Sequence, residues 1–131
     1  MKNKGFTLIE LMLVVIIIGV LAAMVMPRLV GRSEQARVAA AKADIVSIGL
    51  ALDLFEMDFG HYPTDLGALN VNPGGTDAAK WHQYLKKEPL DPWKRKYIYK
   101  YPGTQGGDYD LYSCGQKETC GAGDADVIGN W

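Results

Sequence analysis

An unbroken apolar run opens the chain and predicts a helix of membrane length. Between residues 6 and 26, only Thr7, Glu10 and Gly19 interrupt the apolar side chains. As a helix this run is about 31 Å long, which is enough to cross the hydrocarbon core of a bilayer. Two lysines precede it and favour a cytoplasmic N-terminus. We therefore expect one membrane pass, with the remainder of the chain on the far side.

After Pro27 the pattern becomes amphipathic. Pro27 has no backbone N–H and tends to kink or stop a helix. From residue 28 to 59, apolar positions recur at spacings of three and four, which predicts a second helical stretch with one buried stripe. Gly60 is expected to end this helix. The stripe comprises Val38, Ala41, Ile45, Ile48, Leu52, Phe55 and Phe59.

The rest of the chain predicts short elements. Residues 61–69 indicate a turn followed by a short helix capped by Thr64, and residues 81–86 indicate a second short helix. The alternation of side chains changes to a period of two in residues 96–101 and again in 109–113, which predicts two antiparallel strands.

Residues 128–131 are expected to return as an edge strand or a packed terminus. The expected fold class is α+β, with a long N-terminal helix packed on a small antiparallel sheet. The helix reaches about residue 59, and the sheet with its C-terminal loop occupies about 94–131.

Glu10 is the polar exception within the membrane-length run. An unpaired ionised carboxylate there costs roughly 2.5–3.5 kcal/mol on insertion scales, so we expect a partner for it. A cleaved signal peptide, with residues 20–22 as its small-residue site, does not explain the length of the run or this acid. A plain membrane anchor explains the length but neither Glu10 nor Gly5.

A third interpretation accounts for all of these features. Residues 4–10 (KGFTLIE) resemble the processing site of type IV prepilins. The resemblance implies cleavage after Gly5 and methylation of the new N-terminal residue, Phe6. It divides the chain into a leader (1–5), a transmembrane and assembly half of the helix (6–27) and a periplasmic globular domain (28–131). A proline at the place of Pro27 interrupts the long helix in proteins of this superfamily.

Cleavage after Gly5 would place a positive amine on Phe6, four residues from Glu10. In a staggered bundle of such helices, the Glu10 carboxylate of one subunit can meet the Phe6 amine of the next. A head-to-tail contact that does not close into a ring generates a helical filament. We therefore expect Phe6, Glu10 and Pro27 to govern assembly of a homopolymer.

Charge adds little to this picture. The net charge is −1 and becomes −3 when residues 1–5, with their two lysines, are removed. A nucleic-acid surface would need clustered basic residues on one face, so no nucleic-acid partner is expected. The basic triplet at residues 94–96 is interpreted as a solvated turn.

An ordered set of further motifs narrows the family. Together with the leader, they resemble the major pseudopilins of type II secretion systems over nearly the whole chain. The resemblance implies a type IV pilin-like fold and a fibre-forming subunit of a periplasmic pseudopilus. The motifs are HYPT (61–64), GAL (67–69), LDPW (90–93), Tyr99 with PG (102–103), DYDLYS (108–113) and the closing DAD…IGNW (124–131).

The resemblance also implies partners. These are further copies of the chain, minor pseudopilins, the prepilin peptidase, and an inner-membrane assembly platform with its cytoplasmic ATPase. Growth of the fibre would push folded exoproteins through the outer-membrane secretin. The implied location is the inner membrane, crossed once, with the C-terminal domain in the periplasm.

Members of this family bind one calcium ion in the loop after the last long strand, at a Ser-x-Gly-x-Asp-Gly pattern. Here residues 113–118 are SCGQKE, so Lys117 replaces the loop aspartate. Calcium requires six to eight oxygen ligands, and a lysine at a ligand position opposes the site electrostatically. The remaining candidate ligands are the carbonyl of Cys114 and the carboxylates of Glu118, Asp124 and Asp126.

Cys114 and Cys120 bracket the same loop. A periplasmic domain faces an oxidising compartment, and five intervening residues allow disulfide geometry. Closing so short a ring stabilises the loop by about 2–3 kcal/mol in the chain-entropy model. We expect this disulfide to do some or all of the loop ordering that calcium does in relatives.

Three alternatives remain open at this point. The chain fits a type IV pilin of a surface fibre for adhesion or motility, and a minor pseudopilin at the fibre tip. A membrane-anchored periplasmic enzyme or binding protein is the alternative from another class. The sequence holds no nucleophile elbow, no metal-ligand histidine pair and no phosphate-binding glycine loop, so we expect no enzymatic activity.

Overall fold

The computed structural model describes residues 5–131, apart from the side chains of residues 29 and 30. Two compact units make up the chain, Met1–Ala36 and Arg37–Trp131, and we call the second unit the head. The predicted leader falls mainly on residues 1–4, which lie outside the described part. The elements in order are α1 (Leu8–Phe59), the 3-10 helices η1 (Leu66–Leu69) and η2 (Gly75–Asp77), and strands β1 (Ile98–Lys100), β2 (Asp110–Ser113) and β3 (Ile128–Gly129).

The long helix begins and ends close to the predicted positions. Gly60 adopts φ +77° and its N–H donates to the carbonyl of Glu56 at 2.7 Å, which is a left-handed glycine cap. Pro27 lies inside α1, and the helix is assigned through it. The expected interruption at Pro27 is therefore wrong, since the loss of one N–H donor does not end the helical turns on either side.

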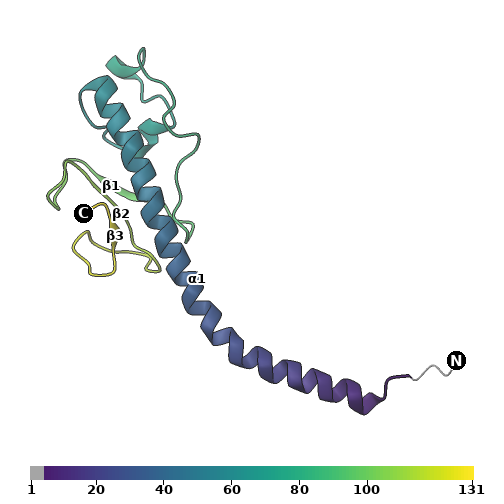
Figure 1. Cartoon of the computed structure of the whole chain (residues 1–131). Helices are drawn as coiled ribbons and strands as arrows, with labels where there is room; N and C mark the ends of the chain where they lie inside the picture. The colour runs from purple at the N-terminus through teal and green to yellow at the C-terminus, as the bar shows by residue number, and fades with distance from the viewer. Residues whose placement is uncertain (1–4) are drawn as a thin grey trace. The chain divides into compact units, whose positions relative to one another are not determined.

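The predicted apolar stripe forms the core of the head. Ile48, Leu52 and Phe55 are almost completely buried, and they pack with Leu69 and Leu111 from the segments that follow α1. Figure 1 shows the three strands beside the second half of α1, with the C-terminus next to the sheet. Since the stripe is the apolar side of an amphipathic helix, burying it against η1 and the sheet stabilises the head.

The sheet is antiparallel throughout, in the order β1-β2-β3. Tyr99 pairs with Leu111, and Tyr112 pairs with Gly129. The α+β prediction is confirmed, but the first strand is shorter than expected. Tyr97 precedes it as a buried residue whose hydroxyl donates to Asp44 of α1 at 2.9 Å.

Two predictions on the segment between helix and sheet are wrong. Asp65, and not Thr64, caps the short helix η1: its carboxylate accepts the N–H of Gly67. Residues 81–86 form no helix. The backbone N–H groups of Tyr84 and Leu85 instead donate to a single carbonyl on η1, that of Leu69, at 2.9 and 2.8 Å, which fixes this irregular stretch beside η1.

Asp110, at the start of β2, is fully buried. The hydroxyl and N–H of Thr104 and the N–H of Gln105 donate to its carboxylate. Burial opposes ionisation, but these hydrogen bonds outweigh it and hold the pKa of Asp110 below its ordinary value. A charged group therefore fixes the loop between β1 and β2.

We expect Asp110→Asn to destabilise the head by about 2 kcal/mol at neutral pH, because charge-assisted hydrogen bonds become neutral ones. The pKa of this group is lower in the folded chain than in the unfolded one. Its stabilising effect is therefore complete above the ordinary aspartate pKa of about 3.9 and is lost as the pH falls through the lower folded value.

Melting curves of both chains between pH 7 and pH 3 test this effect. The difference in melting temperature should stay constant down to about pH 5 and shrink below about pH 4. A difference that does not change with pH would contradict an ionised Asp110.

Candidate assembly segment and C-terminal loop

The start of α1 is built as a capping box around Thr7 and Glu10. The N–H and the hydroxyl of Thr7 both donate to Glu10 Oε2 at 2.9 Å, and the N–H of Glu10 lies 3.3 Å from Thr7 Oγ1. This reciprocal arrangement satisfies donors that a helix start otherwise leaves unpaired. The Glu10 carboxylate therefore has a local hydrogen-bond partner, Thr7, within a single copy of the chain, while its expected charged partner in a neighbouring copy stays a prediction.

Among residues 5–131, no part of the chain covers the apolar half of α1. Every described side chain from Phe6 to Met26 is exposed, and Phe6 itself is 91% exposed. The helix contains an 18-residue window of mean hydropathy 3.0, which is long and apolar enough for one membrane pass. A helix that is apolar on all sides is stable only inside lipid or among other helices.

Asp91 organises the turn that leads into the sheet. Its Oδ1 accepts the N–H groups of Trp93 and Arg95 at 3.0 and 2.8 Å, and its Oδ2 accepts the hydroxyl of Ser113 at 2.7 Å. The same Ser113 oxygen accepts the N–H of Gly115 at 3.0 Å. One buried carboxylate thus ties the LDPW turn to the end of β2 and to the first residues of the C-terminal loop.

Arg95 extends this connection. Its guanidinium donates to the carbonyl of Gly115 at 3.4 Å and to that of Gln116 at 3.0 Å. The basic triplet is a turn, as predicted, with φ +64° at Lys94. The interpretation of the whole triplet as solvated is wrong, however, because Arg95 binds the backbone of the C-terminal loop.

The C-terminal loop is closed by a disulfide between Cys114 and Cys120, whose Cα atoms lie 5.5 Å apart. Lys117, between them, places its ammonium 2.8 Å from Asp126 Oδ2. The hydrogen bond and charge of each partner raise the pKa of Lys117 and lower that of Asp126. The predicted disulfide is confirmed, and the lysine that replaces the family's aspartate has a carboxylate partner within the loop.

The four candidate calcium ligands lie in this loop, and three of them, Cys114, Asp124 and Asp126, make other contacts. The carbonyl of Cys114 accepts the N–H of Lys117 at 3.2 Å, and Asp124 accepts the N–H of Gly121 at 3.0 Å. Glu118 is exposed, and Asp126 holds the lysine ammonium. Across residues 5–131, no three His, Cys, Asp or Glu side chains are grouped so that they could hold a metal ion. With a cation of its own beside Asp126, this donor set does not fit a calcium centre.

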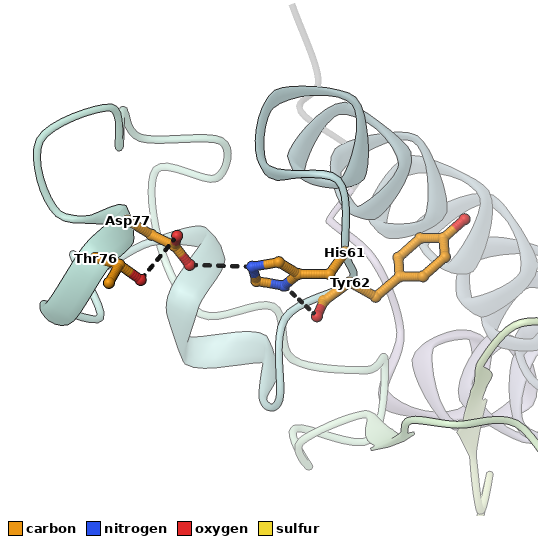
Figure 2. A network of polar contacts seen from close by, with 4 residues as sticks. All are labelled: His61, Tyr62, Thr76 and Asp77. Carbon is orange, nitrogen blue, oxygen red and sulfur yellow. Dashed lines mark hydrogen bonds and ion pairs between the residues drawn. The ribbon is translucent and has the colours of Figure 1, made fainter.

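A histidine and an aspartate meet beyond the end of α1, and Figure 2 shows their contacts. His61 Nε2 lies 3.2 Å from Asp77 Oδ2, and His61 Nδ1 lies 3.1 Å from the carbonyl of Tyr62. The hydroxyl of Thr76 donates to Asp77 at 3.4 Å and not to the histidine. A nucleophilic triad has its histidine between hydroxyl and carboxylate, and these residues are not in that order. The contact of His61 with Asp77 joins η2 to the segment that follows α1.

The sequence predicted the start of α1 and the disulfide. It did not predict that Asp91, Arg95 and Asp110 each hold other parts of the chain in place through hydrogen bonds. For Asp91, the LDPW motif marked the position without revealing its partners. The contacts of Arg95 join residues 20 and 21 positions apart, and those of Asp110 depend on the shape of the loop between β1 and β2. The capping box was detectable, because Thr7 and Glu10 have the required spacing.

Comparison with known proteins agrees with this geometry. Residues 28–131 match the family described as type II secretion system protein G, and residues 1–26 match the prokaryotic N-terminal methylation motif. The chain is 47% identical to type II secretion system core protein G of Pseudomonas aeruginosa, over 99% of this chain and 96% of that protein. It is 42% identical to the core protein G of Escherichia coli K12, over 99% and 92% of the two chains.

The fold also matches a solved structure. The crystal structure of the major pseudopilin from the type 2 secretion system of enterohaemorrhagic Escherichia coli superimposes with a TM-score of 0.64 and 30% identity, over 77% of this chain and 87% of that one. The two family models together cover residues 1–26 and 28–131, which include the start of α1 and the head. The chain therefore belongs to the type II secretion system protein G family, the major pseudopilins.

Proposed function

We propose that this chain polymerises through α1 into a periplasmic pseudopilus, after cleavage behind Gly5 and methylation of Phe6. The main observation behind this proposal is the apolar first half of α1, which is exposed on all sides and holds the Glu10 carboxylate in its first turn. In the membrane, lipid covers this half. In the fibre, the helices of neighbouring copies replace the lipid, and the Phe6 amine of one copy pairs with Glu10 of the next.

The proposed partners follow from this route. The prepilin peptidase acts on the leader, the inner-membrane platform and its cytoplasmic ATPase add subunits, and minor pseudopilins belong to the same fibre. The growing fibre drives folded exoproteins through the outer-membrane secretin. The chain acts as a structural subunit, and we assign it no enzymatic activity or nucleic-acid partner.

We further propose that the C-terminal loop is ordered by its own residues in place of calcium. The disulfide between Cys114 and Cys120 closes the loop, Arg95 binds two of its carbonyls, and the Lys117 ammonium neutralises Asp126. The Lys117 ammonium brings one positive charge to Asp126, whereas a calcium ion would bring two positive charges and bind several oxygen ligands. The loop then keeps its conformation whatever the free calcium concentration.

A strain that lacks this chain tests the assigned role. We expect exported enzymes to accumulate, folded, in the periplasm of that strain and to return to the medium when the wild-type chain is restored. Enzyme activity in medium and periplasm is the measurement. Normal secretion together with a loss of surface filaments or twitching would contradict the secretion role and favour the pilin alternative.

A further inference from the structure

The head exposes an apolar stripe on the side of α1 opposite the core. We define the outward stripe as Val46, Leu50, Leu54 and Met57, which are 54–76% exposed. Their spacings of four, four and three place them on one face of the helix. The buried residues of α1 occupy the opposite face, so the stripe takes no part in holding the head together. Soluble heads rarely keep such a row of large apolar side chains unless a partner covers it.

An open groove of about 550 Å³ lies alongside the stripe. Val46 and Leu50 line its helix side, and Trp131, the last residue, lines the other. Gly49 lies between these walls, and a Cβ there would come within 3.0 Å of the Tyr109 hydroxyl. The absence of a side chain at Gly49 therefore lets the sheet side approach α1 and shapes the floor of the groove.

Trp131 is held in place although it is 51% exposed. The neighbouring Asn130 forms three hydrogen bonds, two with the backbone of Leu111 and one with the carbonyl of Tyr109, at 2.9–3.1 Å. The Trp131 ring meets the Tyr112 ring edge-on, with centroids 5.7 Å apart. A fixed, half-exposed tryptophan loses little side-chain entropy on binding, and tryptophan is enriched among the residues that dominate interfaces.

From these features we infer that the outward stripe and the groove beside it form a subunit–subunit contact of the fibre, occupied by a second copy of this chain. The inference rests on the proposed function, because that function places other copies beside every head. A second copy is the expected occupant because the stripe belongs to α1, and the first half of this same helix is proposed to pack against the α1 helices of other copies. A head-to-tail contact that generates a filament joins two different surfaces of the subunit. The stripe of one copy can therefore bind a surface of the next copy other than that copy's stripe.

The charges around the groove favour a protein surface over a membrane. Lys42 and Asp53 are the charged residues among its lining, one of each sign. Binding to an anionic lipid surface depends on clustered basic residues, and the groove has none. An apolar wall with a mixed polar rim is instead the composition of a protein–protein contact.

Two valines of equal exposure provide a matched test. Val46, on the stripe, is 64% exposed, and Val71, in the loop after η1, is 63% exposed. Both are changed to glutamine in the full chain. We expect Val46→Gln to lower the amount of fibre by roughly fivefold to tenfold, because an apolar contact is lost at every subunit junction, and Val71→Gln to leave it unchanged. Both heads should melt within about 2 °C of wild type, since neither side chain is buried.

Photo-crosslinking identifies the occupant. A benzophenone amino acid replaces Leu50 in one chain and Val71 in another, in cells that assemble the fibre. We expect the Leu50 position to yield a covalent dimer of this chain and the Val71 position to yield none. Capture of lipid or of an exported enzyme at Leu50 would overturn the proposed occupant.

Assembly data separate this inference from the function on which it rests. Normal fibres from Val46→Gln, combined with a secretion defect in the strain that lacks the chain, would overturn the docking surface and leave the pseudopilus role intact. Normal secretion without the chain would overturn both.

Discussion

Glu10→Gln is expected to reduce fibre assembly and secretion by roughly tenfold or more while leaving membrane insertion intact. Glutamine still satisfies a capping box, because its side-chain oxygen accepts from the N–H and hydroxyl of Thr7. It carries no charge, so the proposed ion pair with the Phe6 amine of the next copy is lost. Each 1.4 kcal/mol of lost contact energy lowers an association constant tenfold. Removing one partner of a charge pair inside an apolar bundle costs more than that, because the other charge is left buried and unpaired.

Two companion variants separate the cap from the ion pair. Glu10→Ala removes both, whereas Thr7→Ser keeps the hydroxyl that donates to Glu10 and also keeps the charge. Secretion of a reporter enzyme and the yield of sheared fibres are measured for each, with membrane fractionation as the insertion control. We expect Glu10→Ala to behave as Glu10→Gln and Thr7→Ser to remain near wild type. Full secretion by Glu10→Gln would mean that Glu10 acts only as a helix cap.

The parts of the fold that depend on periodicity were predictable. The buried stripe of α1 repeats every three or four residues over more than twenty residues, so Ile48, Leu52 and Phe55 could be placed in the core from their spacing alone. Gly60 ended the helix as expected because a left-handed cap favours glycine. The pairing of β1 with β2 followed from alternation, although the strand ends did not.

The parts that depend on long-range polar contacts were not predictable. Arg95 meets the carbonyl of Gln116 and Asp91 meets Ser113, pairs that are 21 and 22 residues apart. No local pattern signals such pairs. The helix expected at residues 81–86 did not form because a carbonyl of η1 accepts the backbone donors of that stretch, which is again a tertiary contact. Local propensity loses to such contacts in short segments.

Loss of the disulfide is the second large effect that we expect. Reducing the Cys114–Cys120 bond in the purified full chain removes a constraint on the unfolded loop of about 2–3 kcal/mol in the chain-entropy model. For a head of this size, that corresponds to a fall in melting temperature of roughly 10 °C. The double variant Cys114→Ser, Cys120→Ser should fall by the same amount and should not respond to reductant.

Chelation of the oxidised chain supplies the decisive comparison. If the disulfide, Arg95 and Lys117 order the loop in place of calcium, EDTA should leave the melting temperature of the oxidised chain unchanged. Lys117→Gln removes the ammonium from Asp126 at an exposed pair and serves as the matched control, with only a small expected change. A fall of several degrees on chelation, reversed by added calcium, would show that the ion still orders this loop and would refute its replacement. If EDTA leaves the melting temperature of the oxidised chain unchanged and reduction lowers it, the disulfide orders the loop. Chelation removes only bound calcium, whereas reduction removes only the covalent bond.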